Sequence, residues 1–176
     1  YNYSMSGDIA LYIHVPFCRR KCRYCSFISF EKHEGDIPSY VEALKKELEL
    51  RSHGERVYSI YFGGGTPSLL PVESICNLVN AIGKLFVLDA DAEISMEANP
   101  GTIDQSYLAA IRDSGVNRLS LGAQSFNDKE LATLGRIHSA AEAKQAVGYA
   151  RNAGFDNINL DLIYGLPGQD AKTWAR

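Results

Sequence analysis

VYSIYFGGGTP, at residues 57–67, joins a run of β-branched and aromatic residues to a turn of three glycines. The run predicts a strand over 57–62, and the glycines predict that it ends there. A helical pattern begins after this turn, with apolar residues at Val72, Ile75, Val79 and Ile82. A strand, a turn and an amphipathic helix in this order form one β-α unit.

The same unit repeats along the chain. Further strand-like runs lie at 9–15, 92–97, 116–121 and 157–163. Five strands separated by helices predict a parallel α/β sheet. Because parallel strands need right-handed crossovers, two architectures fit this pattern, an open doubly wound sheet and part of a (βα) barrel.

The helical segments carry their own signals. The first has its apolar stripe at Ile37, Val41, Leu44 and Leu48. A capping-box pattern at Thr102 and Gln105 predicts the start of the third helix, which Gly115 ends. A fourth helix is predicted over 139–154, and Cys76 is expected to be a buried apolar residue of the second.

Composition narrows the class of protein. The 176 residues are 45% hydrophobic and 22% charged, which is typical of one globular domain, here 1–176. The net charge of −3 gives no basic field to hold nucleic acid. Without a membrane-spanning run or a signal-peptide pattern at residues 1–4, we expect a cytoplasmic protein. Because Tyr1 is not Met and a helix starts near Thr173, we expect a part of a longer protein.

Unusual residues follow the carboxyl end of every predicted strand. In parallel α/β folds this edge is where ligands bind and chemistry occurs. Five loops are therefore expected to converge on one site. They are 18–25, 63–67, 97–100, 122–124 and the segment from Asp161 to Pro167.

The spacing Cys18-x3-Cys22-x2-Cys25 places three thiols within eight residues. A [4Fe–4S] cluster normally takes four cysteines, so three would leave one iron open to a ligand. The basic residues between the cysteines favour the thiolate form. A zinc site completed by His14 or His33 is the alternative.

Other site residues have alternative readings. A carboxylate at Glu97, on the face shared with Glu93 and Ser95, suits a ligand ammonium or ribose hydroxyls. The glycine run at 63–67 could instead be an ordinary strand-to-helix turn. Arg136 and Asp161 could form an ion pair, with Gln124 satisfying backbone groups.

The cysteine spacing after the first strand, with Gly-Gly-Gly-Thr-Pro after the second, resembles the radical S-adenosylmethionine (SAM) superfamily. Within it, the chain is similar to the branch that holds oxygen-independent coproporphyrinogen III oxidases and HemW-type heme chaperones. The segments that carry this similarity are 11–18, 63–68, 96–102, 117–126, 135–139 and 159–169. The resemblance covers nearly the whole chain.

The resemblance implies a [4Fe–4S] cluster on Cys18, Cys22 and Cys25, with SAM bound at its open iron. Gly64, Gly65 and Thr66 would let backbone carbonyls approach the SAM ammonium. The further positions that match SAM contacts are Tyr12, Tyr24, Glu97, Gln124, Arg136 and Asp161. Some relatives hold a second SAM, which leaves open which contacts belong to it.

One departure separates the two functions of this branch. The oxidases commonly carry a further cysteine two residues after the third, where this chain has Phe27. Together with the segments 97–102 and 135–139, this favours a heme chaperone that binds heme and transfers it to acceptor proteins. The alternative is a coproporphyrinogen III oxidase that decarboxylates propionate side chains in porphyrin biosynthesis.

The resemblance also implies a (βα)6 partial barrel, of which this chain holds five units. A sixth strand and a further domain completing the heme site are expected outside these residues. The expected partners are heme or porphyrin, a heme-acceptor protein, which could be a membrane protein, and a flavodoxin-type electron donor. The basic residues expected to dock that acidic donor are Arg19, Arg20, Lys21 and Arg23.

Overall fold

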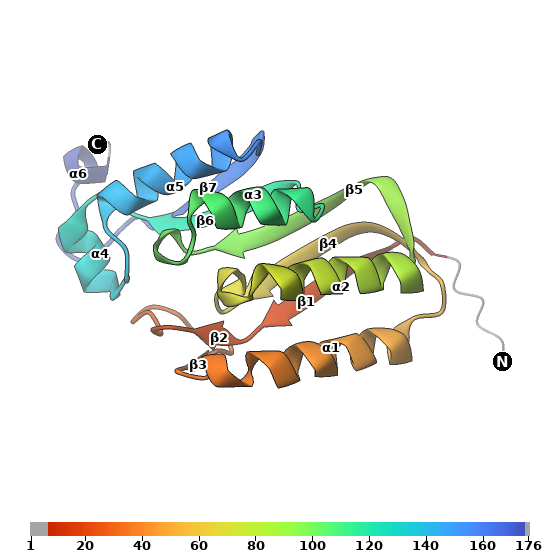
Figure 1. The fold of residues 1–176 in the computed structure, drawn as a ribbon. Helices are drawn as coiled ribbons and strands as arrows, with labels where there is room; N and C mark the ends of the chain where they lie inside the picture. The colour runs from red at the N-terminus through yellow and green to blue at the C-terminus, as the bar shows by residue number, and fades with distance from the viewer. Residues whose placement is uncertain (1–6, 175–176) are drawn as a thin grey trace.

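The computed structural model describes residues 7–174 and contains a sheet of five parallel strands. The strands are β1 (Ile9–Val15), β4 (Arg56–Gly64), β5 (Val87–Ala98), β6 (Arg118–Gln124) and β7 (Asn157–Leu162). They lie in the order β1-β4-β5-β6-β7, the order of the chain (Figure 1). All five predicted strands are confirmed, although β5 begins at Val87 rather than at residue 92.

The helices distinguish the two architectures left open by the sequence. They are α1 (Ile37–Arg51), α2 (Val72–Leu85), α3 (Gln105–Asp113), α4 (Asp128–Leu134), α5 (Ala140–Asn152) and α6 (Ala171–Trp174). α1 contacts α2, α2 contacts α3 and α3 contacts α5, and these four lie side by side along the sheet (Figure 1). A doubly wound sheet reverses its strand order and covers both faces. Because the strand order here never reverses, the fold is a partial (βα) barrel.

The two faces of the sheet have different chemistry. Side chains that point toward the helices form the core, among them Ile60, Met96 and Leu119, which are fully buried. The alternate side chains of the same strands are polar, as at Ser95 and Ser120. Three of these polar positions form one row across β5, β6 and β7, because Glu97 pairs with Ser120 and Ser120 with Asn159. The inner face is therefore a polar surface rather than a packed barrel core.

The start of α3 differs from the prediction. Asp104, not Thr102, caps this helix, and its side chain accepts a hydrogen bond from the Tyr107 backbone N–H at 2.7 Å. Thr102 lies in a 3-10 turn, η3 (Pro100–Thr102). The chain instead forms a capping box at Ser139 and Glu142, where α5 begins. The predicted capping box was wrong because Asp104 is a stronger cap candidate two residues later.

Other features were not predicted. α4 is a separate helix before α5, and a two-stranded sheet of β2 (Phe17–Cys18) and β3 (Phe30–Glu31) supports the cysteine loop. Two further 3-10 turns, η1 (Glu34–Asp36) and η2 (Pro67–Leu69), precede α1 and α2. Cys76 is half-buried in α2 rather than buried.

Residues 1–4, which carry the expectation on a signal peptide, lie outside the described part of the chain. Between residues 7 and 174 there is no helix with the length and apolar character needed to cross a membrane. The predicted helical start near the last residues corresponds to α6.

Candidate functional site

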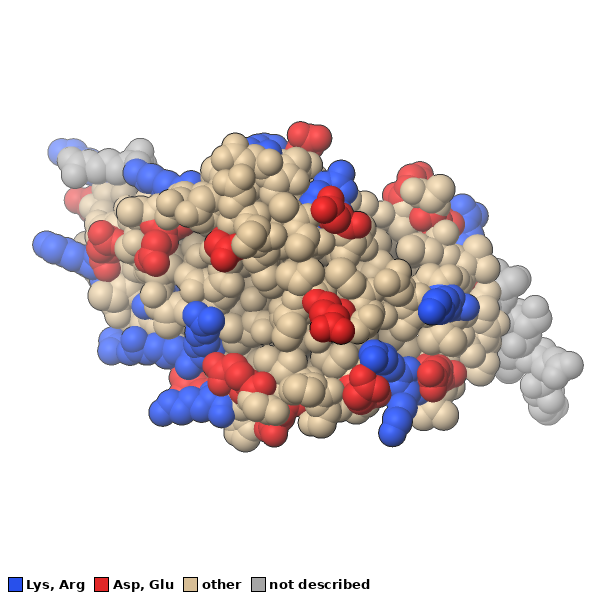
Figure 2. All heavy atoms as spheres, viewed as in Figure 1, with Lys and Arg blue, Asp and Glu red and all other residues tan. Residues whose placement is uncertain are grey.

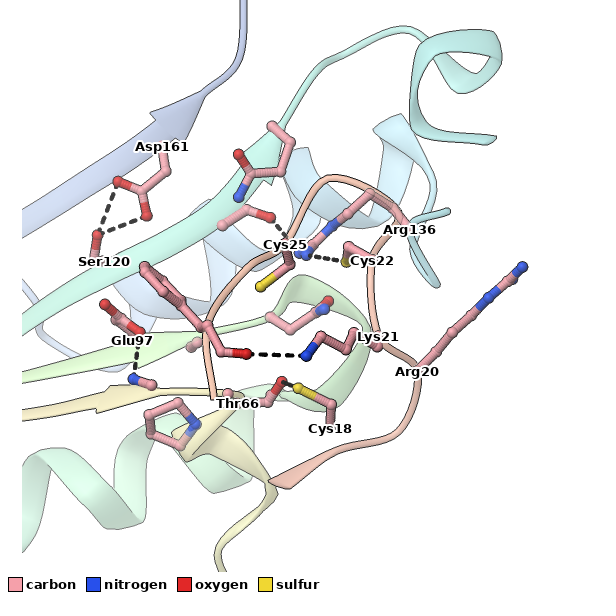
Figure 3. Close-up of a pocket in the computed structure, with 18 of the residues that line it drawn as sticks. Cys18, Arg20, Lys21, Cys22, Cys25, Thr66, Glu97, Ser120, Arg136 and Asp161 are labelled. Carbon is pink, nitrogen blue, oxygen red and sulfur yellow. Dashed lines mark hydrogen bonds between the residues drawn. The ribbon is translucent and has the colours of Figure 1, made fainter. Parts of the chain in front are cut away.

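A cavity of about 160 Å³ opens at the carboxyl ends of the strands, where five loops meet. Its wall includes the cysteine loop, the glycine turn after β4 and the ends of β5, β6 and β7 (Figure 3). Every predicted site residue except Tyr12 lines it. They are Cys18, Cys22, Tyr24, Cys25, Gly64, Gly65, Thr66, Glu97, Gln124, Arg136 and Asp161. Cys18 and Asp161, at the two ends of this set in sequence, thus meet at one edge of the sheet.

The cysteine loop is held in place from two sides. The Phe30 backbone N–H donates to the Pro16 carbonyl at 2.7 Å, and the His14 Nε2 lies 2.9 Å from the Ile28 carbonyl. On the other side the Arg23 N–H donates to the Leu134 carbonyl at the end of α4, at 3.1 Å. These contacts hold the loop against the end of β1 and the end of α4.

The three cysteines are free thiols that face one cavity. The Thr66 hydroxyl donates to the Cys18 Sγ at 3.6 Å, and the Arg136 Nη1 donates to the Cys22 Sγ at 3.3 Å. Cys18 is buried, whereas Cys22 and Cys25 are partly exposed. Two of the three sulfurs thus have a hydrogen-bond donor.

A single-ion site is not formed in this arrangement. Within residues 7–174, no three His, Cys, Asp or Glu side chains converge closely enough to hold one metal ion. The histidines of the zinc alternative are engaged elsewhere, His14 with the Ile28 carbonyl and His33 with the Asp36 carboxylate at 2.8 Å. Thiolates that bind separate irons of a cluster need not meet at one point. Among the described residues, neither histidine therefore joins the cysteines in a ligand set.

The glycine turn approaches the cysteine loop too closely for side chains. A Cβ on Gly65 would lie 2.6 Å from the Phe17 carbonyl oxygen and 3.1 Å from the Cys18 Sγ. Gly64 has a φ of +116°, which side-chain-bearing residues rarely adopt. The glycines therefore allow the turn to pack closely against the cysteine loop, and they also line the cavity.

Glu97 is the partly buried acid at the end of β5. It accepts hydrogen bonds from the Tyr61 hydroxyl at 2.8 Å and from the Gly64 backbone N–H at 3.2 Å. Burial raises the pKa of Glu97, although both hydrogen bonds favour its charged form. Tyr12 lies outside the cavity lining, exposed, with its ring stacked 6.1 Å from that of Tyr61. Tyr12 thus meets the site through Tyr61 and through His14, whose Nδ1 lies 3.3 Å from the Tyr12 hydroxyl.

Asp161 belongs to a hydrogen-bonded group on the polar inner face. Its carboxylate accepts from the Ser120 hydroxyl at 3.0 Å and from the Asn159 amide at 2.7 Å. Arg136 instead donates through Nη2 to the Gly122 carbonyl at 2.6 Å. Arg136 and Asp161 therefore do not form the ion pair that was the alternative reading of these two residues.

Gln124 ends β6 in a strained conformation. Its φ is +66°, which is uncommon outside glycine, and the regular pairing of β6 with β7 is interrupted between Leu121 and Gln124. This departure from strand geometry occurs where the side chain lines the cavity. Burial raises the pKa of Tyr24, across the cavity, to about 12.

The basic residues of the cysteine loop are used differently from one another. Arg19, Lys21 and Arg23 each donate to a backbone carbonyl, of Gly101, Phe27 and Thr133 respectively. Arg20 also lines the cavity, and the end of its side chain points away from the other labelled residues (Figure 3). Lys and Arg side chains gather at the left end of the molecule, where Figure 1 draws the cysteine loop (Figure 2).

Several residues of the site were missed from the sequence. Ser120 lines the cavity, and its position in β6, between buried Leu119 and Leu121, was the available signal. His138 is buried, with its ring nitrogens 3.1 Å from the Asn99 Oδ1 and 3.0 Å from the Ala123 carbonyl. It joins the loop after β5 to the end of β6, a contact that local pattern does not reveal.

Known proteins are similar to this chain in sequence. The chain is 43% identical over 170 residues to "Heme chaperone HemW" of Haemophilus influenzae, covering 92% of this chain and 44% of that protein. It is also 43% identical over 166 residues to the protein of that name from Escherichia coli, again covering 92% and 44%. It therefore spans less than half the length of these relatives.

A solved structure is also similar. Coproporphyrinogen III oxidase (HemN) from Escherichia coli, described as a radical SAM enzyme, superposes with a TM-score of 0.88 at 35% identity, covering 94% of this chain and 39% of that one. The family description "Radical SAM superfamily" matches residues 12–176, which include the cysteine loop and every strand but the start of β1. The chain therefore belongs to the radical SAM superfamily.

Proposed function

We propose that this chain is the cofactor-binding core of a HemW-like heme chaperone. In this proposal Cys18, Cys22 and Cys25 hold a [4Fe–4S] cluster and the adjoining cavity holds SAM. The observation that supports it most is the convergence of all three cysteines and nearly every expected SAM contact on one cavity. The unlinked thiols suit a reducing compartment, and we propose the cytoplasm.

The donor set fits an iron–sulfur cluster. Three free thiols face the same space, and cationic or hydroxyl donors reach two of their sulfurs. Three cysteine ligands leave one iron of a [4Fe–4S] cluster without a protein ligand, which is the position SAM would take. When bound, the cluster and SAM supply one-electron redox chemistry.

The remaining wall of the cavity suits a zwitterionic ligand with hydroxyl groups. Glu97 and Asp161 offer carboxylate oxygens to an ammonium or to ribose hydroxyls. Arg136 offers a guanidinium whose Nε is buried without a hydrogen-bond partner among the described residues. Tyr24, Gln124 and the turn of Gly64, Gly65 and Thr66 are proposed to complete the contacts.

Two observations favour the chaperone over the oxidase. The proteins named "Heme chaperone HemW" are 43% identical to this chain, whereas the oxidase is 35% identical. Phe27 occupies the position two residues after Cys25, and its side chain is 60% exposed on the cavity wall. The proposed partners are heme and a heme-acceptor protein. A membrane protein is one class of acceptor.

The test uses the full-length protein reconstituted with iron and sulfide, with Cys18→Ser as the variant that should lose the cluster and Cys76→Ser as the control that should keep it. A heme absorption band and transfer of that heme to an apo-acceptor protein support the chaperone. Heme neither bound nor transferred by a protein that carries its cluster contradicts it. The oxidase predicts vinyl products from coproporphyrinogen in anaerobic turnover with SAM and reductant, and their absence removes that alternative.

An acidic flavodoxin-type donor is proposed to reduce the cluster. Arg20 is the residue of the cysteine loop best placed to meet it, because the end of its side chain points away from the other labelled residues (Figure 3). Arg20→Glu should slow reduction by flavodoxin, and added salt should slow reduction of the unchanged protein. Reduction rates that respond to neither change contradict this docking site.

A further inference from the structure

Arg136 links the cysteine loop to the barrel. Its Nη1 donates to the Cys22 Sγ at 3.3 Å, and its Nη2 donates to the Gly122 carbonyl on β6 at 2.6 Å. The same Nη1 lies 3.5 Å from the Tyr24 hydroxyl. One guanidinium therefore contacts a proposed cluster ligand and a strand of the barrel at once.

The position of Arg136 is set by the end of α4. Gly135 follows that helix with a φ of +75°, which turns the chain, and the Arg136 backbone N–H donates to the Leu131 carbonyl at 2.9 Å. The guanidinium is planar and its donors are fixed relative to one another. With Nη2 held by Gly122, Nη1 is thereby aimed at the Cys22 sulfur.

The three sulfurs have unequal surroundings. Cys22 faces a cationic N–H donor at 3.3 Å, whereas Cys18 faces the neutral Thr66 hydroxyl at 3.6 Å. Hydrogen bonds from charged groups are about twice as strong as those between neutral groups. Arg136 is therefore the stronger of these two donors.

We propose that Arg136 is a positioning residue that raises the reduction potential of the cluster through its hydrogen bond to Cys22. The inference rests on the cluster proposed above. Reduction adds one electron, supplied by the external donor, and makes the cluster and its thiolates more negative. A cationic N–H donor at a ligand sulfur stabilises this reduced form more than the oxidised one.

The test is a potentiometric titration of the reconstituted cluster, followed by electron paramagnetic resonance in the absence of SAM. Leaving SAM out removes any contribution from the SAM contact proposed for the same side chain. Arg136→Met should lower the ratio of reduced to oxidised cluster at a fixed potential about tenfold, which is about 59 mV for one electron. Arg136→Gln, which keeps a neutral N–H donor, should lower it less.

Two control variants separate the hydrogen bond from other effects. Arg20→Met removes a positive charge of the cysteine loop that has no bond to sulfur among the described contacts, and its shift should be smaller. Arg19→Met removes another positive charge of the loop, whose guanidinium donates to the Gly101 carbonyl rather than to sulfur, and its shift should also be smaller. Reduction potentials are compared only between samples of equal iron content. If Arg136→Met does not retain iron, Arg136→Gln is compared with the wild-type protein instead.

The outcomes are distinct. An unchanged potential in iron-loaded Arg136→Met, or an equal shift in Arg20→Met, overturns the inference and leaves the cluster itself standing. If the wild-type protein takes up no iron, the proposed function and the inference are overturned together. A lower potential confined to the Arg136 variants supports the inference.

Discussion

Gly65→Ala places a methyl group where the glycine turn meets the cysteine loop. The new Cβ would lie 2.6 Å from the Phe17 carbonyl oxygen, 3.0 Å from the Val15 carbonyl oxygen and 3.1 Å from the Cys18 Sγ. Two of these atoms are backbone, and the Gly65 N–H donates to the same Val15 carbonyl at 2.7 Å, so the turn cannot retreat without losing that bond.

The cost has two parts. Forcing a methyl into a filled space costs about 1–3 kcal/mol, and weakening the Gly65 hydrogen bond costs about 1 kcal/mol. We expect a loss of about 2–4 kcal/mol in the free energy of unfolding. For a chain of this size that corresponds to a melting temperature lower by about 4–16 °C.

Thermal unfolding followed by circular dichroism measures this change in the metal-free protein. The matched control is Gly83→Ala in α2, where a Cβ would meet nothing within 4 Å. An exposed helical glycine replaced by alanine should gain about 0.5–1 kcal/mol, so the two alanines should shift the melting temperature in opposite directions. If Gly65→Ala has the same melting temperature as the wild-type protein and takes up as much iron, the proposed close packing is refuted.

Three further results are expected. Cys18→Ser should lose bound iron after reconstitution whereas Cys76→Ser should keep it, and equal iron in both would contradict the ligand set. Glu97→Gln should raise the melting temperature at pH 7, because burial raises the pKa of Glu97 and its ionisation therefore disfavours the folded state. This gain in melting temperature should shrink as the pH falls toward 4.5, the ordinary pKa of a glutamate. A difference that does not depend on pH would exclude this cause. Burial lowers the pKa of His138, so the free energy of unfolding should fall as the pH drops below 6.5. His138→Gln should remove this pH dependence in denaturant titrations, and an unaltered pH dependence would assign it to another group.

Local pattern was enough to predict the strands and the place of the site. The alternation of apolar runs and helical stripes marks each β-α unit, and the carboxyl ends of parallel strands share one edge. This alone brings the loop at 18–25 near Asp161. The choice between barrel and doubly wound sheet needs the order of the strands in space, which periodicity does not contain, and here the family resemblance supplied it.

Contacts between distant loops could not be predicted in the same way. The bond from Arg136 to Cys22 joins residues 114 positions apart, and it depends on the turn at Gly135. The ion pair considered for Arg136 failed because its guanidinium is held by the Gly122 carbonyl, while Asp161 is satisfied by Ser120. Such choices among partners depend on distances that only the folded chain defines.

The central claim, a cluster with one iron open to SAM, is tested most directly by anaerobic reconstitution with iron and sulfide. Electron paramagnetic resonance of the reduced protein, with and without SAM, is the measurement. The account predicts a [4Fe–4S]⁺ signal that changes when SAM is added and is lost in Cys18→Ser. A protein that binds zinc and no iron, or a cluster signal that SAM leaves unchanged, would contradict it.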